Sequence, residues 1–299
     1  MKRLNPEILK CISRFEAAMR KRFLVKTIFF EKVFRGKGLE FDSYRAYTPE
    51  DDAGLIDWKA SKRFGKPLLR QYIEERSLKI FFIVDVSDNM VFGSIRLKSE
   101  LAAEISTSLA HLILGLGDSI GFALYNKNIV SMKMFSRGTK QFYIFAKELS
   151  NPHIYGGRSD LKKTLEFLMP YLKGASSVFI ISDFIKTDKD FYKTLKEFAA
   201  KYETIGIMIR DPVDLSMPDL KREIVIEDPD TGRQLLINPS LIKHQYEKYA
   251  MLQKREVEKI FKNANVDLVD IYTNQDFVKP LVTFLKSRVE RRKYILPKR

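Results

Sequence analysis

The sequence KIFFIVDVSDNM, residues 79–90, decides the fold that this chain is predicted to adopt. Its run from Ile80 to Val84 is apolar throughout and consists of β-branched and aromatic residues. Such a run is typical of a strand that is buried on both faces of a parallel sheet. The oxygen-bearing side chains that follow it are Asp85, Ser87, Asp88 and Asn89. Because ligands of open α/β sheets bind outside the carboxyl ends of the strands, these side chains lie where a ligand is expected.

Similar apolar runs recur along the chain, and amphipathic helical patterns separate them. The further core strands are predicted over residues 118–125, 176–183, 203–210 and 266–272, with an edge strand over 129–135. Helical patterns begin near residues 97, 138, 161, 188, 241 and 276. This alternation predicts an α/β fold with a doubly wound, mostly parallel sheet and helices on both faces.

The chain is predicted to contain one large domain with three additions. Residues 77–290 form the α/β domain, and residues 1–76 form an amino-terminal helix and a lid segment around Trp58 that packs on the sheet. A hairpin insertion is expected over about 211–240, because Asp228-Pro-Asp-Thr-Gly232 separates two short apolar runs. Residues 291–299 form a basic tail. The amino-terminal helix has a basic face, which suits either packing on the protein or contact with a membrane surface.

Composition restricts the class of partner and the compartment. The net charge of +15 favours an acidic protein surface, an anionic membrane or nucleic acid. No helix-turn-helix, zinc-finger or base-stacking motif is evident, which disfavours nucleic acid. The single cysteine, Cys11, cannot form an internal disulfide, and no apolar run approaches the roughly 20 residues of a membrane span. The amino terminus lacks a signal-peptide pattern. We therefore expect a cytoplasmic protein without a transmembrane segment, at most peripheral to a membrane.

Polar side chains from separate loops are expected to converge at one edge of the sheet. Two core strands end in aspartate, Asp85 and Asp183, and the loop that carries Ser159 lies between them in sequence. The candidate ligands are Asp85, Ser87, Asn89, Ser159 and Asp183. Five oxygens around one point suit Mg²⁺, which prefers octahedral oxygen coordination. A second interpretation stays open, because Asp, Ser and Asn after a strand also cap helices and form turns.

This arrangement resembles the von Willebrand factor A domain and its metal-ion-dependent adhesion site. The motif of that site is Asp-x-Ser-x-Ser after the first strand, a Thr from a second loop and an Asp from a third. Asp85, Ser87 and Asp183 match this motif, Ser159 takes the place of the Thr, and Asn89 replaces the second Ser. The resemblance implies a Mg²⁺ site built from these five residues, where an open coordination position accepts a carboxylate of a partner protein.

A closer resemblance is to one bacterial and archaeal branch, the family called domain of unknown function 58. The matching motifs are Gly36 and Gly38, Glu40-Phe41, Arg45-Ala-Tyr47, Glu50-Asp-Asp52, Ile56-Asp-Trp58, Gly156-Gly-Arg-Ser-Asp-Leu161, Ile181-Ser-Asp-Phe184, Arg210-Asp-Pro212 and Glu227-Asp-Pro-Asp-Thr-Gly232. Proteins of this family are typically encoded beside a MoxR-type AAA+ ATPase and membrane-anchored von Willebrand-type proteins. The resemblance implies that this chain partners such an ATPase in a chaperone-like maturation system.

The expected function is therefore a non-enzymatic protein-interaction module. One alternative is a basic adaptor that binds an anionic membrane surface or nucleic acid through its basic termini. Another is a hydrolase that uses the strand-end aspartates. Aspartate-nucleophile phosphatases place a second Asp two residues after the first, but Ser87 stands there in this chain. No Ser-His-Asp or Cys-His pattern is evident either, which favours a function without catalysis.

Overall fold

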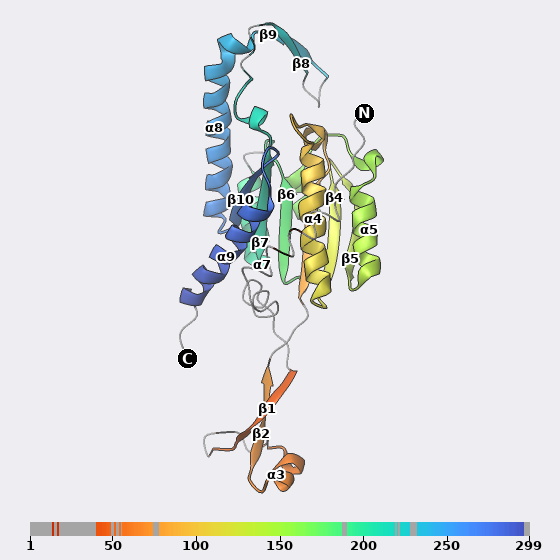
Figure 1. Cartoon of the computed structure of the whole chain (residues 1–299), viewed down its shortest axis with the longest axis vertical. Coiled ribbons are helices and arrows are strands. Elements are labelled where there is room, and N and C mark those ends of the chain that lie inside the picture. Colours follow the sequence, from red (N-terminus) through yellow and green to blue (C-terminus); the bar gives the residue numbers. More distant parts are fainter. Residues whose placement is uncertain are drawn as a thin grey trace.

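The centre of the molecule is a six-stranded sheet with the order β10-β7-β6-β3-β4-β5 (Figure 1). The computed structural model describes residues 14, 17, 40–48, 51, 54, 56–73, 78–186, 190–218, 220, 222–227 and 232–295. The strands of this sheet are β3 (Lys79–Asp85), β4 (Ser119–Tyr125), β5 (Ile129–Ser136), β6 (Ser177–Ser182), β7 (Thr204–Arg210) and β10 (Asp267–Tyr272). Only the edge strand β5 pairs antiparallel, which confirms the predicted mostly parallel α/β sheet.

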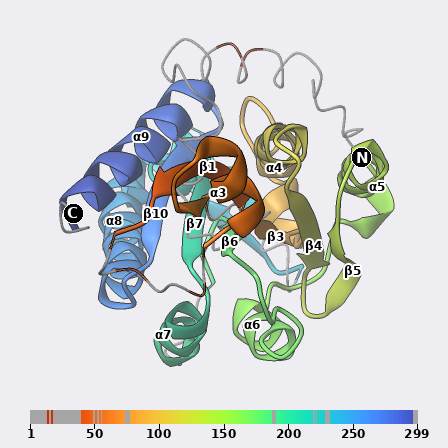
Figure 2. The same cartoon turned by 90° about the horizontal axis from the view of Figure 1, so that it is seen from below.

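Helices cover both faces of the sheet, as Figure 2 shows from one end. One face carries α4 (Lys98–Gly115), α5 (Thr139–Leu149) and α9 (Val278–Ile295). The other carries α6 (Leu161–Leu168), α7 (Phe191–Lys201) and α8 (Pro239–Asn263). The central strands β4, β6 and β7 are buried along their whole length, since their apolar side chains enter both of these layers.

Strand register brings several acidic residues to one edge of the sheet. Val84 of β3 pairs with Ile181 of β6, and both strands run in the same direction. Asp85 ends β3, Asp183 follows β6 directly, and Asp211 follows β7 directly. These three carboxylates therefore lie along the carboxyl edge, where open α/β sheets bind their ligands.

The predicted hairpin insertion is present as β8 (Ile224–Glu227) and β9 (Gln234–Ile237). These strands pair antiparallel, with Val225 opposite Leu236 and Ile226 opposite Leu235. In Figure 1 the hairpin lies beyond the carboxyl edge of the sheet and leads into α8. It is therefore the element that projects farthest on the side of the candidate site.

A second small unit consists of β1 (Glu40–Ala46), α3 (Trp58–Phe64) and β2 (Leu68–Ile73). Asp57 caps α3 by accepting hydrogen bonds from the backbone N–H groups of Lys59 and Ala60. Figure 1 shows this unit beyond the amino edge of the sheet, at the opposite end from the hairpin. The predicted packing of residues 1–76 on the sheet includes residues outside the described part of the chain, so it stays a prediction, as do the domain boundaries.

The two ends of the chain are only partly described. Most of the predicted amino-terminal helix lies outside the described residues, although Arg14 and Ala17 are helical. Helix α9 extends to Ile295 and thus includes the beginning of the predicted basic tail, residues 291–299. Within the described residues, no helix is both long enough and apolar enough to span a membrane.

Candidate functional site

Asp85 is the centre of a buried hydrogen-bond network at the carboxyl edge. Its side chain is 1% exposed, and Oδ1 accepts a hydrogen bond from the backbone N–H of Ser87 at 2.9 Å. Oδ2 accepts hydrogen bonds from the hydroxyls of Ser182, Ser159 and Tyr125 at 2.7, 2.9 and 3.3 Å. Burial raises the pKa of Asp85, and the nearby Asp183 carboxylate raises it further. Four donors thus satisfy a carboxylate that water does not reach.

Asp183 forms a buried ion pair with Lys98, the first residue of α4. Lys98 Nζ lies 2.7 Å from Asp183 Oδ2 and 3.1 Å from Asp214 Oδ2. The other oxygen of Asp183 accepts a hydrogen bond from the backbone N–H of Ile185 at 3.0 Å. Burial alone would lower the pKa of Lys98, but Asp183 and Asp214 outweigh it and the pKa is raised. Lys98 is therefore a buried ammonium that joins two acidic loops.

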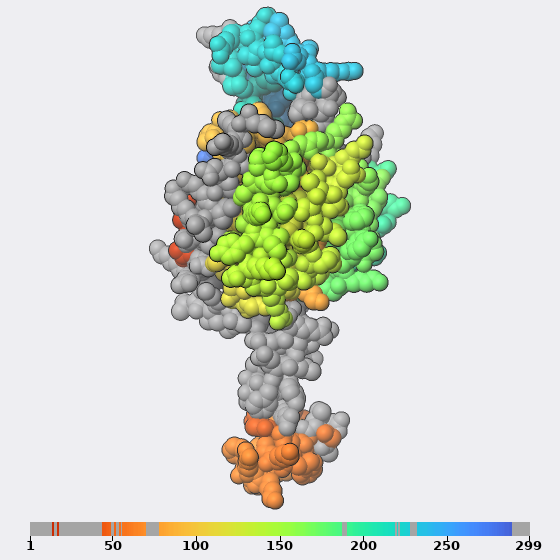
Figure 3. All heavy atoms as spheres, turned by 90° about the vertical axis from the view of Figure 1, so that its right-hand side faces the viewer, coloured from red at the N-terminus to blue at the C-terminus, as the bar shows by residue number. Residues whose placement is uncertain are grey.

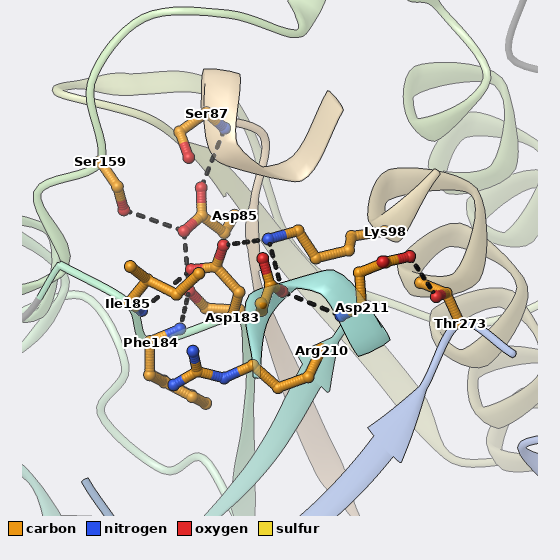
Figure 4. Close-up of polar contacts among 12 residues, drawn as sticks. Asp85, Ser87, Lys98, Ser159, Asp183, Phe184, Ile185, Arg210, Asp211 and Thr273 are labelled. Carbon is orange, nitrogen blue, oxygen red and sulfur yellow. Dashed lines mark hydrogen bonds and ion pairs between the residues drawn. The ribbon is translucent and has the colours of Figure 1, made fainter. Parts of the chain in front are cut away.

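Asp211 connects these loops to the next strand end. Its Oδ2 accepts hydrogen bonds from the backbone N–H and the hydroxyl of Ser94 at 2.8 and 3.0 Å, and from Thr273 Oγ1 at 2.5 Å. The backbone N–H of Asp211, which caps the short helix η4 (Pro212–Asp214), donates to Asp214 Oδ2 at 2.8 Å. The loops after β3, β7 and β10 are therefore held together by side-chain hydrogen bonds, of which Figure 4 shows the one between Thr273 and Asp211.

The loop after β6 has an unusual backbone conformation. Phe184 has a φ of 50°, in the left-handed region that a bulky residue rarely adopts. Its ring is buried against Phe261 of α8, with the ring centroids 4.8 Å apart. Gln253 Nε2, also on α8, donates hydrogen bonds to the carbonyls of Phe184 and Ile185 at 2.8 and 3.1 Å. Helix α8 thus holds the loop that presents Asp183.

The structure brings most of the predicted site residues together. Asp85, Ser87 and Ser159 are joined directly by hydrogen bonds, and Asp183 lies beside Asp85 (Figure 4). Asn89 lies in the short helix η2 (Asp88–Val91) and is half-buried. Among the hydrogen bonds of the described residues, none joins its side chain to the other four. The hydroxyl of Ser87 is buried and has no hydrogen-bond partner within the described part of the chain.

The arrangement does not fit a divalent cation. Hydrogen-bond donors occupy the Asp85 carboxylate, and the Lys98 ammonium occupies Asp183. The hydroxyl of Ser159 donates its hydrogen to Asp85, as the hydroxyl of Ser182 does. Among the described residues, no group of three or more His, Cys, Asp or Glu side chains is arranged to hold a metal ion. The Mg²⁺ site implied by the resemblance thus stays a prediction that this donor set disfavours.

Sequence reasoning missed several members of this site, with Lys98 foremost. Lys98 stands at the start of a largely apolar helix, where a charged residue normally faces solvent. Its partners Asp183 and Asp214 follow 85 and 116 residues later. No local signal in the sequence separates Lys98 from a solvent-facing lysine at the start of a helix.

Comparisons with known proteins place the chain in a family of unknown function. A family model described as "Protein of unknown function DUF58" matches residues 43–256. The uncharacterized protein Mb1516 of Mycobacterium bovis is 26% identical over 258 residues, which cover 85% of this chain and 80% of that protein. The uncharacterized protein MAV169 of Mycobacterium avium is 27% identical over 135 residues, covering 44% of this chain and 78% of that protein.

Solved structures with a related chain path were also found. BatB from Bacteroides thetaiotaomicron matches with a TM-score of 0.46 at 10% identity, over 71% of this chain and 99% of that one. The SpRpn10 VWA domain matches with a TM-score of 0.38 at 13% identity, over 69% of this chain and 94% of that one. The family model covers well over half of the sequence, so this chain belongs to the DUF58 family.

Proposed function

We propose that this chain is a non-enzymatic protein-interaction module that binds its partner through the hairpin β8–β9. The exposed apolar side chains of this hairpin carry the proposal. Val225 and Leu236, which pair across the strands, are 59% and 60% exposed. Ile226 and Leu235 form the next pair and are 36% and 60% exposed. Since adjacent pairs point to opposite sides of a two-stranded sheet, the hairpin is apolar on both faces.

A hairpin with apolar side chains on both faces is not expected to be stable when it is fully exposed to solvent. An isolated two-stranded hairpin is marginally stable, and exposed apolar patches mark binding surfaces. Leu241, in the first turn of α8 shortly after the hairpin, is a further exposed apolar side chain, at 80%. In Figure 3 this part of the molecule, coloured turquoise, projects at one end. A partner that covers it would bury apolar area at the end of the molecule that holds the candidate site.

The partner that we propose is a subunit of a MoxR-type AAA+ ATPase. Two features support this choice. The chain resembles a family whose members are typically encoded beside such ATPases, and its net charge is +15. A strongly basic chain favours a partner with an acidic surface. The proposed partner surface is thus an apolar groove rimmed by carboxylates. Within the same proposal, membrane-anchored von Willebrand-type proteins belong to the wider assembly.

The buried state of the aspartates supports a role without catalysis. A carboxylate nucleophile has to reach its substrate, with an acid or base beside it. Asp85 is 1% exposed and accepts four hydrogen bonds, while Asp183 is 2% exposed and paired with Lys98. Both carboxylates are better placed to hold loops together than to attack a substrate.

The test compares the hairpin with a matched apolar surface elsewhere. The hairpin variant is Leu235→Asp/Leu236→Asp, and the control variant is Phe167→Asp/Tyr171→Asp on the exposed side near α6. The measurement is the Kd for the purified MoxR-type ATPase of the same organism, by biolayer interferometry. The hairpin variant is expected to bind at least about ten-fold more weakly, and the control like wild type.

Three results would overturn the proposal. The first is that the hairpin variant binds the ATPase as tightly as wild type does. The second is that wild type does not bind it. The third is that light scattering finds a wild-type dimer that the hairpin variant loses, because a second copy of this chain would then cover the hairpin.

A further inference from the structure

We propose that Lys98 is a built-in cation of the carboxyl edge, in the role that a divalent metal ion has in a metal-ion-dependent adhesion site. The inference rests on the contacts of Lys98 and is independent of the proposed partner. It assigns to one side chain of this chain the charge that the resemblance would assign to Mg²⁺.

The position of the Lys98 ammonium is that of a bridging cation. Its side chain is 1% exposed, and the side chains of its partners Asp183 and Asp214 are 3% and 9% exposed. The three residues come from the start of α4, the loop after β6 and the helix η4 after β7. One ammonium therefore joins three segments that converge at the carboxyl edge (Figure 4). A metal ion bound between such loops would join them in the same way.

The charge of the site requires a cation of some kind. Asp85 and Asp183 are both almost fully buried, and the charge of Asp183 acts directly on Asp85. Buried carboxylates close to each other repel and are stable as anions only when they are paired or hydrogen-bonded. Hydroxyl and amide donors satisfy Asp85, whereas Asp183 and Asp214 share the charge of Lys98. The ammonium thus pairs with both of these carboxylates and offsets one of their two negative charges.

An ammonium on a side chain differs from a bound metal in two ways. It cannot be removed by a chelator, so the site stays assembled without divalent ions. It also leaves no open position for a carboxylate of a partner, because the Lys98 side chain is 1% exposed and its ammonium already pairs with Asp183 and Asp214. A carboxyl edge built in this way is constitutively ordered, and its state does not depend on the divalent metal concentration.

The test measures the metal dependence of thermal unfolding in wild type, Lys98→Ala and Lys254→Ala. Lys254 is the matched control, because its ammonium pairs with Asp270 at 2.6 Å on the outer part of the sheet. Each protein is heated in EDTA, in millimolar MgCl₂, and in NaCl of the same ionic strength. The Tm of wild type is expected to be the same in MgCl₂ and in the matched NaCl. In EDTA the Tm of Lys98→Ala is expected to lie on the order of 10 °C below that of wild type, because two buried carboxylates lose their cation.

MgCl₂ is expected to restore part of that loss in Lys98→Ala. The removal of the lysine side chain leaves the Asp183 and Asp214 carboxylates without their cation. The Tm of Lys254→Ala is expected to fall by less than that of Lys98→Ala and to be the same with and without MgCl₂. The proposal is overturned if Mg²⁺ raises the Tm of wild type, if Lys98→Ala is as stable as Lys254→Ala, or if Lys98→Ala shows no response to Mg²⁺.

A second set of measurements decides the matter if Lys98→Ala does not fold. Wild type is titrated with Mn²⁺ and followed by electron paramagnetic resonance, and no saturable binding is expected. The double variant Lys98→Met/Asp183→Asn is expected to melt at a higher temperature than Lys98→Met, because the ammonium and one carboxylate are removed together. Saturable Mn²⁺ binding to wild type, or a double variant no more stable than Lys98→Met, would contradict the assignment.

Discussion

At the scale of single residues, Asp211 shows how one carboxylate holds several strand ends. It is fully buried and accepts hydrogen bonds from Ser94, Thr273 and the backbone N–H of Val213. Burial alone would raise the pKa of Asp211, but the hydrogen bonds from Thr273 and Ser94 outweigh it and the pKa is lowered. The folded state therefore prefers the charged form of this side chain more strongly than the unfolded chain does.

A pH-dependent loss of stability follows for Asp211→Asn. The amide cannot accept all of these hydrogen bonds, so a cost of about 2–3 kcal/mol is expected at neutral pH. A lowered folded pKa adds stability above the unfolded value of about 4, and this stability is lost as the pH falls through the folded pKa. Urea unfolding of wild type and variant should therefore show a difference that shrinks below about pH 4. A difference that is independent of pH would contradict the role of the charge.

The residues of the candidate site show how much of it could be predicted from the sequence. Asp85, Ser87, Asp183 and Ser159 were predictable because each directly follows a strand or precedes a helix, and parallel strands bring their ends to one edge. Lys98 was not predictable, since its place at the site depends on how α4 lies across the sheet. Nothing local in the sequence distinguishes a lysine that points into the site from one in solvent.

At the scale of elements, the buried strands were the ones that could be predicted from their apolar sequence patterns. The strands β3, β4, β6 and β7 are apolar without a break and buried along nearly their whole length, so their patterns predicted them. The hairpin β8–β9 was predicted from its turn sequence. In contrast, β1 and α3 are rich in charged and exposed residues and show no apolar period. Their formation depends on local contacts such as the Asp57 cap and the pairing of β1 with β2.

Two glycine-to-alanine substitutions are expected to change the stability in opposite directions, because Gly206 is closely packed and Gly115 is not. A methyl group at Gly206 of β7 would lie 2.5 Å from Phe261 Cε1 and 2.7 Å from Leu268 Cδ1. Gly206→Ala is therefore expected to cost about 1–3 kcal/mol through overpacking. At Gly115, the last residue of α4, nothing lies within 4 Å of the added methyl group. Gly115→Ala is expected to add up to about 1 kcal/mol through helix propensity.

Urea unfolding followed by far-UV circular dichroism measures both effects. The same assay on both variants controls for the general change from Gly to Ala. If Gly206→Ala were as stable as Gly115→Ala, Phe261 would have room to move and the interface between β7 and α8 would be less tightly packed than described.

At the scale of the whole molecule, two small units lie at opposite ends of the sheet. The hairpin β8–β9 lies beyond the carboxyl edge, and the unit of β1, α3 and β2 lies beyond the amino edge (Figures 1 and 3). The candidate site is at the carboxyl edge, where β3 ends at Asp85, whereas β3 begins at Lys79 on the amino edge. In this arrangement α3, which begins at Trp58, lies at the end of the molecule opposite the candidate site.

The position of Trp58 predicts that fluorescence and circular dichroism report different transitions. Trp58 is the only tryptophan of the chain, it lies in α3, and it is 69% exposed. A unit of two strands and one short helix has little core of its own and is marginally stable. The urea midpoint from tryptophan fluorescence is therefore expected to lie below the midpoint from far-UV circular dichroism, which reports mainly the large sheet and its helices. Coincident midpoints would contradict this expectation and would favour the predicted lid that packs on the sheet and unfolds with it.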